Sequence, residues 1–187
     1  MPSLILIKHS LPEIVPGVPA SQWRLSEEGH RRCHALARQL AAYQPQVLVS
    51  SVEPKAVETA QIVGADLGLS VETAEGLHEH ERDNVGFLGN EAFEASVKAF
   101  FERPEELVFG SETADEAHTR FAAALSLVLQ RHPGVPVAAV AHGTVISLFV
   151  ARATRIEPFP LWKRLGLPSY VVLSLPEFRL DSVVERC

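Results

Sequence analysis

Three short segments of this chain are continuously apolar, without the alternation of polar and apolar residues that marks a half-exposed strand. They lie at residues 3–7, 47–49 and 135–141. Such runs are typical of strands covered on both faces. Pro136 fits near the start of the last run, because its missing N–H group costs no hydrogen bond to a neighbouring strand there. We therefore predict a sheet with helices on both of its faces.

Helical patterns separate these segments, and each predicted helix start carries a local signal. The signals are a hydroxyl N-cap followed by acidic residues, a proline in the first turn, a capping box and a glycine after a strand. The predicted helices begin near Ser26, Pro54, Thr113 and Gly143, and two final strands are predicted at residues 170–175 and 179–184. Strands alternating with helices favour an α/β fold with a largely parallel sheet.

Composition limits the class of protein. The chain has 187 residues, of which 47% are apolar, so we expect a single domain over residues 1–187 with a core that needs no disulfide framework. The net charge of −6 argues against nucleic-acid and membrane-surface binding. We expect a cytoplasmic protein for three reasons. The chain has only two cysteines, its short apolar opening ends at Lys8, and no stretch is long enough to span a bilayer.

Polar side chains suited to an anion follow three of the predicted strands. Lys8 and His9 follow the first strand, Ser50 and Ser51 follow the second ahead of Lys55, and His142 and Gly143 follow the third. The carboxyl ends of parallel strands meet at one edge of a sheet, where ligands bind in such folds, so we expect these groups to lie together. Gly143 permits a close backbone approach, and the amides after it open a helix whose positive end suits an anion.

Each of these side chains has an ordinary explanation when taken alone. A single histidine at a strand end is usually a hydrogen-bonded residue, and a single lysine is usually a solvated surface charge. Their combination is different, because cationic groups that converge on one edge of an acidic protein repel one another unless an anion neutralises them. The sequence therefore predicts a phosphate-binding site at this edge.

Histidine has a chemical use at such a site. A neutral imidazole can attack phosphorus and form a phosphoenzyme, which divides a difficult displacement into two easier steps. Lysines and a second imidazole would place positive charge around the equatorial oxygens of the phosphoryl group during its transfer. The proton donor for the leaving oxygen is expected at residues 77–83, where Glu79 and Glu81 are both candidates, since a neighbouring phosphate raises the proton affinity of a carboxyl.

These motifs resemble those of the histidine phosphatase superfamily, also called the phosphoglycerate mutase-like or branch-one family. The family's Arg-His-Gly corresponds here to Lys8-His9-Ser10, and its Ser-Ser-x-x-x-Arg-Ala-x-x-Thr-Ala to the segment from Ser50 to Ala60. Its Leu-x-Glu and His-Gly match Leu77-His78-Glu79 and His142-Gly143. Four motifs in this order, with Leu25-Ser26-x-x-Gly29 between them, extend the resemblance over nearly the whole chain.

The resemblance implies a three-layer α/β sandwich with a mainly parallel, six-stranded central sheet. It implies a metal-independent phosphatase that needs no cofactor and hydrolyses a small phosphomonoester through a phosphohistidine. By resemblance, the catalytic residues are His9, Glu79 and His142, and the phosphate-binding residues are Lys8, Lys55, Ser10 and Gly143.

This chain departs from the family pattern in ways that leave alternatives open. Lysines replace both motif arginines, which keeps the charge but loses the planar bidentate fork, and Ser10 replaces the motif glycine. A non-catalytic module that binds a phosphorylated ligand or a protein is therefore an alternative on the same fold. A phosphoglycerate-type mutase is another, although the Gly-Glu continuation of the first motif in true mutases is absent.

The remaining signals concern metal binding and specificity. His78 and His80 could chelate a metal if their segment were extended, but zinc sites usually need a third ligand with its own fixed geometry. We expect specificity to reside in residues 10–25, 78–110 and 155–168, two of which include long irregular stretches. The partner is expected to be a small phosphorylated metabolite, and the protein a monomer or homodimer.

Overall fold

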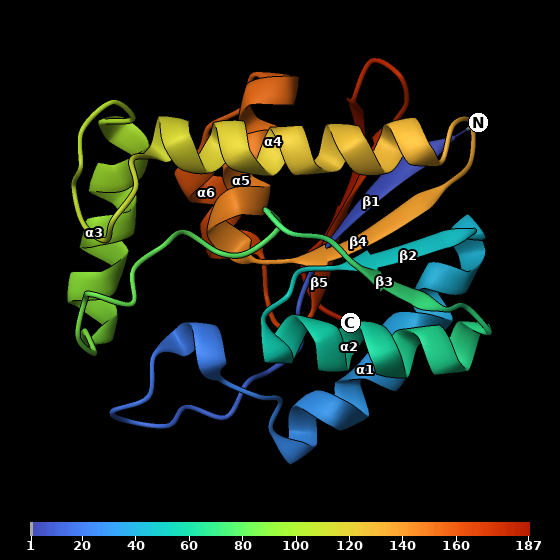
Figure 1. The fold of residues 1–187 in the computed structure, drawn as a ribbon, viewed down its shortest axis with the longest axis horizontal. Helices are drawn as coiled ribbons and strands as arrows, with labels where there is room; N and C mark the ends of the chain where they lie inside the picture. Colours follow the sequence, from blue (N-terminus) through green and yellow to red (C-terminus); the bar gives the residue numbers. More distant parts are fainter. Residues whose placement is uncertain (1) are drawn as a thin grey trace.

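A six-stranded sheet forms the middle layer of the protein (Figure 1). In the computed structural model, which describes residues 2–187, the strand order is β3-β2-β4-β1-β5-β6. Strands β3, β2, β4 and β1 are mutually parallel, and β5 runs antiparallel to both β1 and β6. The strands are β1 (Ser3–Lys8), β2 (Val47–Ser50), β3 (Val71–Thr73), β4 (Val137–Ala141), β5 (Ser169–Ser174) and β6 (Arg179–Val184). The predicted mainly parallel, six-stranded α/β sandwich is confirmed.

Helices cover both faces of this sheet. Figure 1 shows α1 and α2 on one face and α4 and α5 on the other, with α3 and α6 next to the second pair. The α-helices are α1 (Glu27–Leu40), α2 (Pro54–Leu67), α3 (Asn90–Glu102), α4 (Ala114–Arg131), α5 (Gly143–Thr154) and α6 (Pro158–Arg164). Two 3-10 turns, η1 (Ala20–Gln22) and η2 (Ala41–Tyr43), complete the helical structure.

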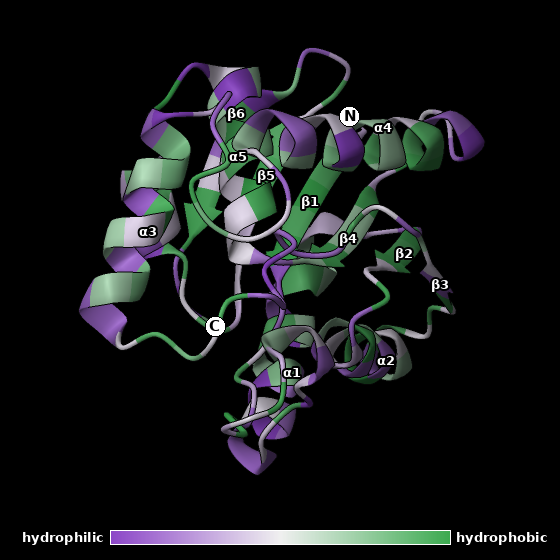
Figure 2. Cartoon of the chain, turned by 60° about the vertical axis from the view of Figure 1, so that its left-hand side comes forward, coloured by the Kyte–Doolittle hydropathy of each residue, from purple (hydrophilic) through white to green (hydrophobic). Residues whose placement is uncertain are grey.

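Strand β1 joins the two cores because successive side chains of a strand point to opposite faces. Leu4 and Leu6 pack in the core under α4 and α5, whereas Ile5 and Ile7 pack in the core over α1 and α2. All four side chains are fully buried. In Figure 2 the hydrophobic colour is concentrated on the strands, which explains why their sequence lacks polar alternation.

The predicted helix starts are formed by the residues that signalled them. The side chain of Ser26 accepts a hydrogen bond from the Gly29 amide, and Thr113 and Glu116 form a complete capping box. In α2, a Cβ atom on Gly64 would lie 2.7 Å from the Leu69 carbonyl oxygen. This glycine therefore lets the chain turn back closely into β3, although glycine weakens a helix interior.

Strand β3 and helices α3 and α6 were not anticipated from the sequence. Strand β3 has three residues at the edge of the sheet, which is too short to give a periodic pattern. Helix α3 lies in the segment that we had assigned to specificity, and it buries Val97 and Phe100. Within residues 2–187, none of the helices has the length and apolar character needed to cross a membrane.

Candidate active site

The ends of three parallel strands bring the predicted site residues together. The amide of His9, the first residue after β1, donates at 3.1 Å to the carbonyl of Ala141, the last residue of β4. The Ser51 amide donates to the Val140 carbonyl at 2.8 Å, directly after β2. The rings of His9 and His142 lie with their centroids 5.2 Å apart. The predicted convergence of the two histidines at one sheet edge is therefore observed.

His9 is held in a single tautomer. Its Nδ1 atom lies 2.7 Å from the Ser10 carbonyl oxygen, which can only accept, so Nδ1 carries the proton and Nε2 carries the lone pair. The pKa of His9 lies well below its usual value, chiefly because the ring is buried and also because His142 and Lys55 are close. The imidazole is therefore neutral near pH 7, as a nucleophile requires.

His142 is the N-terminal cap residue of α5 and is fully buried. Its Nε2 atom lies 2.8 Å from the Ser51 hydroxyl and 3.7 Å from Oε1 of Glu53, while its Nδ1 atom has no hydrogen-bond partner among the described residues. Burial, reinforced by the charge of Lys55, holds the pKa of His142 well below its usual value. A nearby anion would oppose that shift and favour the protonated ring.

Lys8 lies against Gly143. A Cβ atom at Gly143 would be 3.1 Å from Cε of Lys8, so the missing side chain gives the lysine its room. The ammonium group donates one hydrogen bond to the Leu165 carbonyl at 2.7 Å, and two of its hydrogens remain. Burial lowers the pKa of Lys8 from 10.5 to about 8, an effect that Glu79 opposes and Arg82 reinforces.

Lys55 forms a buried ion pair with Glu53, which we did not predict. The two side chains are 6% and 8% exposed, and the Lys55 ammonium also donates to the Ala20 carbonyl at 2.6 Å. Oε1 of Glu53 accepts a hydrogen bond from the Glu79 amide at 2.8 Å, which links the pair to the predicted acid. In the sequence, Glu53 is only an acidic residue before a helix start, a position that the helix dipole already explains.

The carboxylate of Glu79, which is on a loop, lies against the first turn of α5. Its oxygens accept hydrogen bonds from the amides of Thr144 at 3.1 Å, Val145 at 3.3 Å and His80 at 2.8 Å. Burial raises the pKa of Glu79, but the Arg82 guanidinium 3.7 Å away and the hydrogen bonds from the His80 and Thr144 amides outweigh it. The net pKa lies well below the usual range, so Glu79 is ionised without a ligand.

Of the two candidate acids, only Glu79 contacts the amides that follow His142 at the start of α5. The Glu81 side chain is 49% exposed and lies 3.1 Å from Nε2 of His78. An exposed carboxylate paired with a neighbouring histidine is ordinary for a surface glutamate, so the position of Glu81 requires no role near the strand ends. These contacts favour Glu79 over Glu81, and its role as the acid stays a prediction.

Comparisons with known proteins identify the family of this chain. The family model of the histidine phosphatase superfamily (branch 1) matches residues 18–182. The chain belongs to this family. The match begins after Lys8-His9-Ser10, so the role of His9 rests on the geometry described above rather than on the match.

One curated relative and several solved structures are similar to this chain. "Phosphoglycerate mutase-like protein 4" from Arabidopsis thaliana is 32% identical over 137 residues, which cover 69% of this chain and 60% of that protein. A mycobacterial glucosyl-3-phosphoglycerate phosphatase structure with VO3 has a TM-score of 0.81 at 23% identity, with all of both chains covered. A mutant phosphoserine phosphatase from Entamoeba histolytica with phosphoserine has a TM-score of 0.79 at 19% identity, covering 98% and 97% of the two chains.

Both polar groups of Ser10 already have hydrogen-bond partners in this chain. Its amide donates to the Thr59 hydroxyl at 3.0 Å, and its own hydroxyl donates to the Gly29 carbonyl at 2.7 Å. Both polar groups are thus used between α1 and α2, and the side chain is fully buried. Phosphate binding by Ser10 stays a prediction, and it requires that one of these two hydrogen bonds break.

The two histidines beside Glu79 in this family member do not form a chelating pair. His80 is buried against aromatic rings, with centroid distances of 4.2 Å to Phe100 and 4.7 Å to Phe109. His78 instead lies near Glu81. Among residues 2–187, no group of three or more His, Cys, Asp or Glu side chains is arranged to hold a metal.

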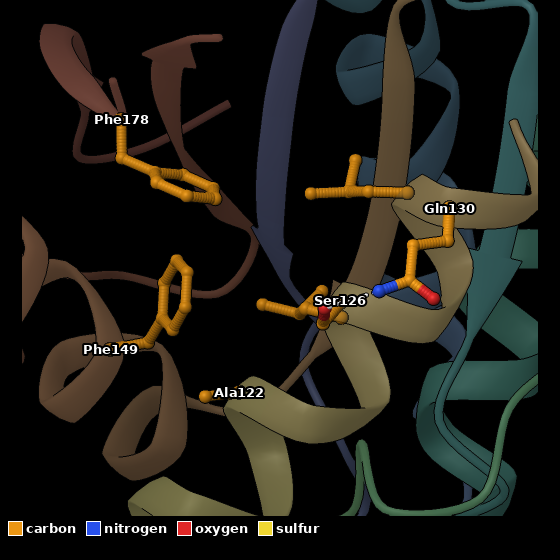
Figure 3. Close-up of a pocket in the computed structure, with 7 residues that line it drawn as sticks. Ala122, Ser126, Gln130, Phe149 and Phe178 are labelled. Carbon is orange, nitrogen blue, oxygen red and sulfur yellow. Dashed lines mark hydrogen bonds between the residues drawn. The ribbon is translucent and has the colours of Figure 1, made fainter. Parts of the chain in front are cut away.

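A separate hollow, lined by none of the predicted site residues, lies between α4 and α5 (Figure 3). It has a volume of about 400 Å³. Figure 3 shows Phe149 and Phe178 side by side in its wall, opposite Ser126 and Gln130. Its lining residues are Ala122, Leu125, Ser126, Leu129, Gln130, Phe149 and Phe178, none of which titrates. This hollow offers no acid, base or cation for phosphoryl transfer.

Proposed function

We propose that this chain is a phosphomonoester hydrolase that forms a phosphohistidine on Nε2 of His9. The observation that carries the proposal is the Nδ1 hydrogen bond of His9 to the Ser10 carbonyl, which leaves the Nε2 lone pair available beside cationic groups. Lys8, Lys55 and Arg82 supply three cations near the two imidazoles, against the carboxylates of Glu53 and Glu79. A site with one excess positive charge suits a phosphoryl group.

In the first step, Nε2 of His9 attacks phosphorus, a nitrogen–phosphorus bond forms and the ester oxygen–phosphorus bond breaks. When the dianionic ester binds, its negative charge raises the pKa of Glu79, which takes up a proton from solvent. The leaving oxygen takes this proton from the Glu79 carboxyl, so the product is a neutral alcohol. Lys8, Lys55 and a protonated His142 stabilise the negative charge on the equatorial oxygens. The positive end of α5 supports the same charge.

In the second step, the Glu79 carboxylate removes a proton from water and the resulting hydroxide equivalent attacks phosphorus. The nitrogen–phosphorus bond breaks, inorganic phosphate leaves, and both His9 and Glu79 return to their starting states. The overall reaction converts a phosphomonoester and water into an alcohol and phosphate. It uses no redox step, metal or cofactor.

The proposed substrate is a small phosphorylated metabolite. Two similar structures carry the names of phosphatases, a glucosyl-3-phosphoglycerate phosphatase and a phosphoserine phosphatase, and these names support the reaction class. The net charge of −6 disfavours a polyanionic partner such as a nucleic acid. We further propose that the protein acts in the cytoplasm as a monomer or homodimer.

The decisive experiment compares p-nitrophenyl phosphate hydrolysis, between about pH 5 and 7.5 with a chelator present, in the wild type, His9→Ala and His34→Ala. His34 is a matched control because it is an exposed histidine on α1 that pairs with Asp66. We expect chelator-resistant turnover in the wild type and in His34→Ala, and none in His9→Ala. Turnover that persists in His9→Ala would overturn the proposal.

A non-catalytic phosphate-binding module is the second candidate. It is favoured by the partners that the two motif lysines already have, namely Glu53 and Ala20 for Lys55 and Leu165 for Lys8. This candidate predicts that inorganic phosphate raises the unfolding temperature. It also predicts that neither p-nitrophenyl phosphate nor any member of a phosphorylated metabolite panel is hydrolysed.

A further inference from the structure

One arginine of α4 holds the loop that carries Glu79. The Arg120 guanidinium donates through Nη1 to the carbonyls of Gly76 at 2.8 Å and His78 at 2.9 Å. Through Nη2 it donates to the carbonyl of Glu79 itself at 3.1 Å. Three carbonyls within four residues are thus fixed by one rigid group whose donors lie in a plane.

Glu112 fixes the orientation of that guanidinium. Its two oxygens accept from Nη2 of Arg120 at 2.6 Å and from Nε at 3.2 Å, a bidentate pair whose side chains are only 18% and 9% exposed. The same Glu112 carboxylate accepts the Glu81 amide at 3.0 Å. The Glu112 carbonyl faces Nε2 of His80 at 3.2 Å, so the pair anchors the loop on both sides of Glu79.

The backbone of Glu79 is consequently held at both of its polar groups. Its amide donates to Glu53 at 2.8 Å, and its carbonyl accepts from Arg120. The loop belongs to no strand or helix, so it has no regular ladder to satisfy these groups. The side chain between them is the one that reaches the first turn of α5.

We infer that Arg120, oriented by Glu112, is a positioning residue for the acid Glu79, which it holds within reach of the leaving oxygen. This inference rests on the proposed function and deepens it. Arg120 makes no hydrogen bond to His9 or His142 in the structure, and it acts through the carbonyls of the loop. Placement matters here because a misplacement of about 1 Å can cost about 100-fold in rate.

The test measures kcat/KM for phenyl, p-nitrophenyl and 2,4-dinitrophenyl phosphate in Arg120→Met. These esters all release a phenol, but they differ in how strongly the leaving oxygen needs a proton. This need is greatest for phenyl phosphate. A misplaced acid slows phenyl phosphate selectively, whereas general loss of folded protein lowers all three values alike. The ratio between substrates is therefore independent of how much of the variant is folded.

Glu79→Gln provides the reference, because it removes the proton while keeping the shape of the side chain. For phenyl phosphate we expect losses of about 100-fold or more in Glu79→Gln and about 10-fold in Arg120→Met. For 2,4-dinitrophenyl phosphate both losses should stay below about threefold. Arg120→Lys, which retains the charge and several donors, should recover part of the phenyl phosphate rate.

Arg131→Met is the matched control. Arg131 also lies on α4 and pairs with a glutamate, Glu72, but its side chain is 56% exposed and far along the helix from the loop. We expect unchanged kcat/KM values for all three esters in this variant.

The outcomes separate the inference from the function on which it rests. A steep leaving-group dependence in Glu79→Gln, with equal losses for all three esters in Arg120→Met, would overturn the positioning role alone. A Glu79→Gln variant without any leaving-group dependence would overturn the assignment of Glu79 as the acid. Steeper dependence in both variants, with partial recovery in Arg120→Lys, supports both.

Discussion

Oε2 of Glu79 accepts a hydrogen bond from the backbone amide of Thr144 at 3.1 Å. The proposed acid therefore occupies the positive end of α5, which is also the place best suited to an incoming anion. Phosphate must share this helix terminus with a carboxylate or displace it. This competition ties the protonation state of the site to the presence of its ligand.

The first prediction is proton uptake on binding of a dianion. Three cations and two carboxylates leave one net positive charge, so a dianion makes the site negative and raises the pKa of His142 and Glu79. Titration calorimetry with sulfate, in buffers of different ionisation enthalpy, should show uptake of up to about one proton. His142→Asn and Glu79→Gln then identify the group that takes it up. Binding with no proton uptake in the wild type would contradict this account.

The second prediction concerns the alkaline limb of activity. The pKa of Lys8 is lowered to about 8, so Lys8 is protonated below that pH and neutral above it. Because the neutral amine no longer attracts phosphate, we expect kcat/KM to fall as pH rises through about 8. Lys8→Arg keeps its charge and should move this limb to higher pH. An identical limb in both proteins would assign the titration to another group.

The third prediction concerns Gly143. In Gly143→Ala the new Cβ would lie 3.1 Å from Cε and 3.3 Å from Nζ of Lys8, so the ammonium must move. We expect weaker phosphate binding, measured by calorimetry, without a loss of thermal stability, since alanine favours a helix by up to about 1 kcal/mol over glycine. Unchanged phosphate affinity would show that the position of Lys8 is unimportant.

The fourth prediction concerns the buried pair of Glu53 and Lys55. Glu53→Gln leaves the Lys55 ammonium buried without its counter-charge, and breaking such a pair typically costs about 3 kcal/mol of unfolding free energy. Glu102→Gln is the matched control, because Glu102 pairs with Lys98 at 3.7 Å with both side chains more than half exposed. Glu102→Gln should lower the free energy of unfolding, measured by urea denaturation, by less than about 0.5 kcal/mol. Equal costs in the two variants would show that burial adds nothing to the pair.

The local signals in the sequence were sufficient for the sheet, most helix starts and the two histidines. Three apolar runs predicted the strands of the sheet centre, and Ser26 and Thr113 form the caps that their positions suggested. His9 and His142 could be placed together because the carboxyl ends of parallel strands necessarily meet at one edge. That argument depends only on strand direction, which the alternation of strands and helices already indicates.

The remaining features of the site depend on distance in space rather than on distance along the chain. Glu53 meets the Glu79 amide across 26 positions, and Arg120 meets the Glu79 carbonyl across 41. The roles of Glu79 and Glu81 are separated only by which side chain reaches α5. Tertiary structure decides these points, because burial and hydrogen-bond partners, which set charge states, arise when segments far apart in the sequence pack together.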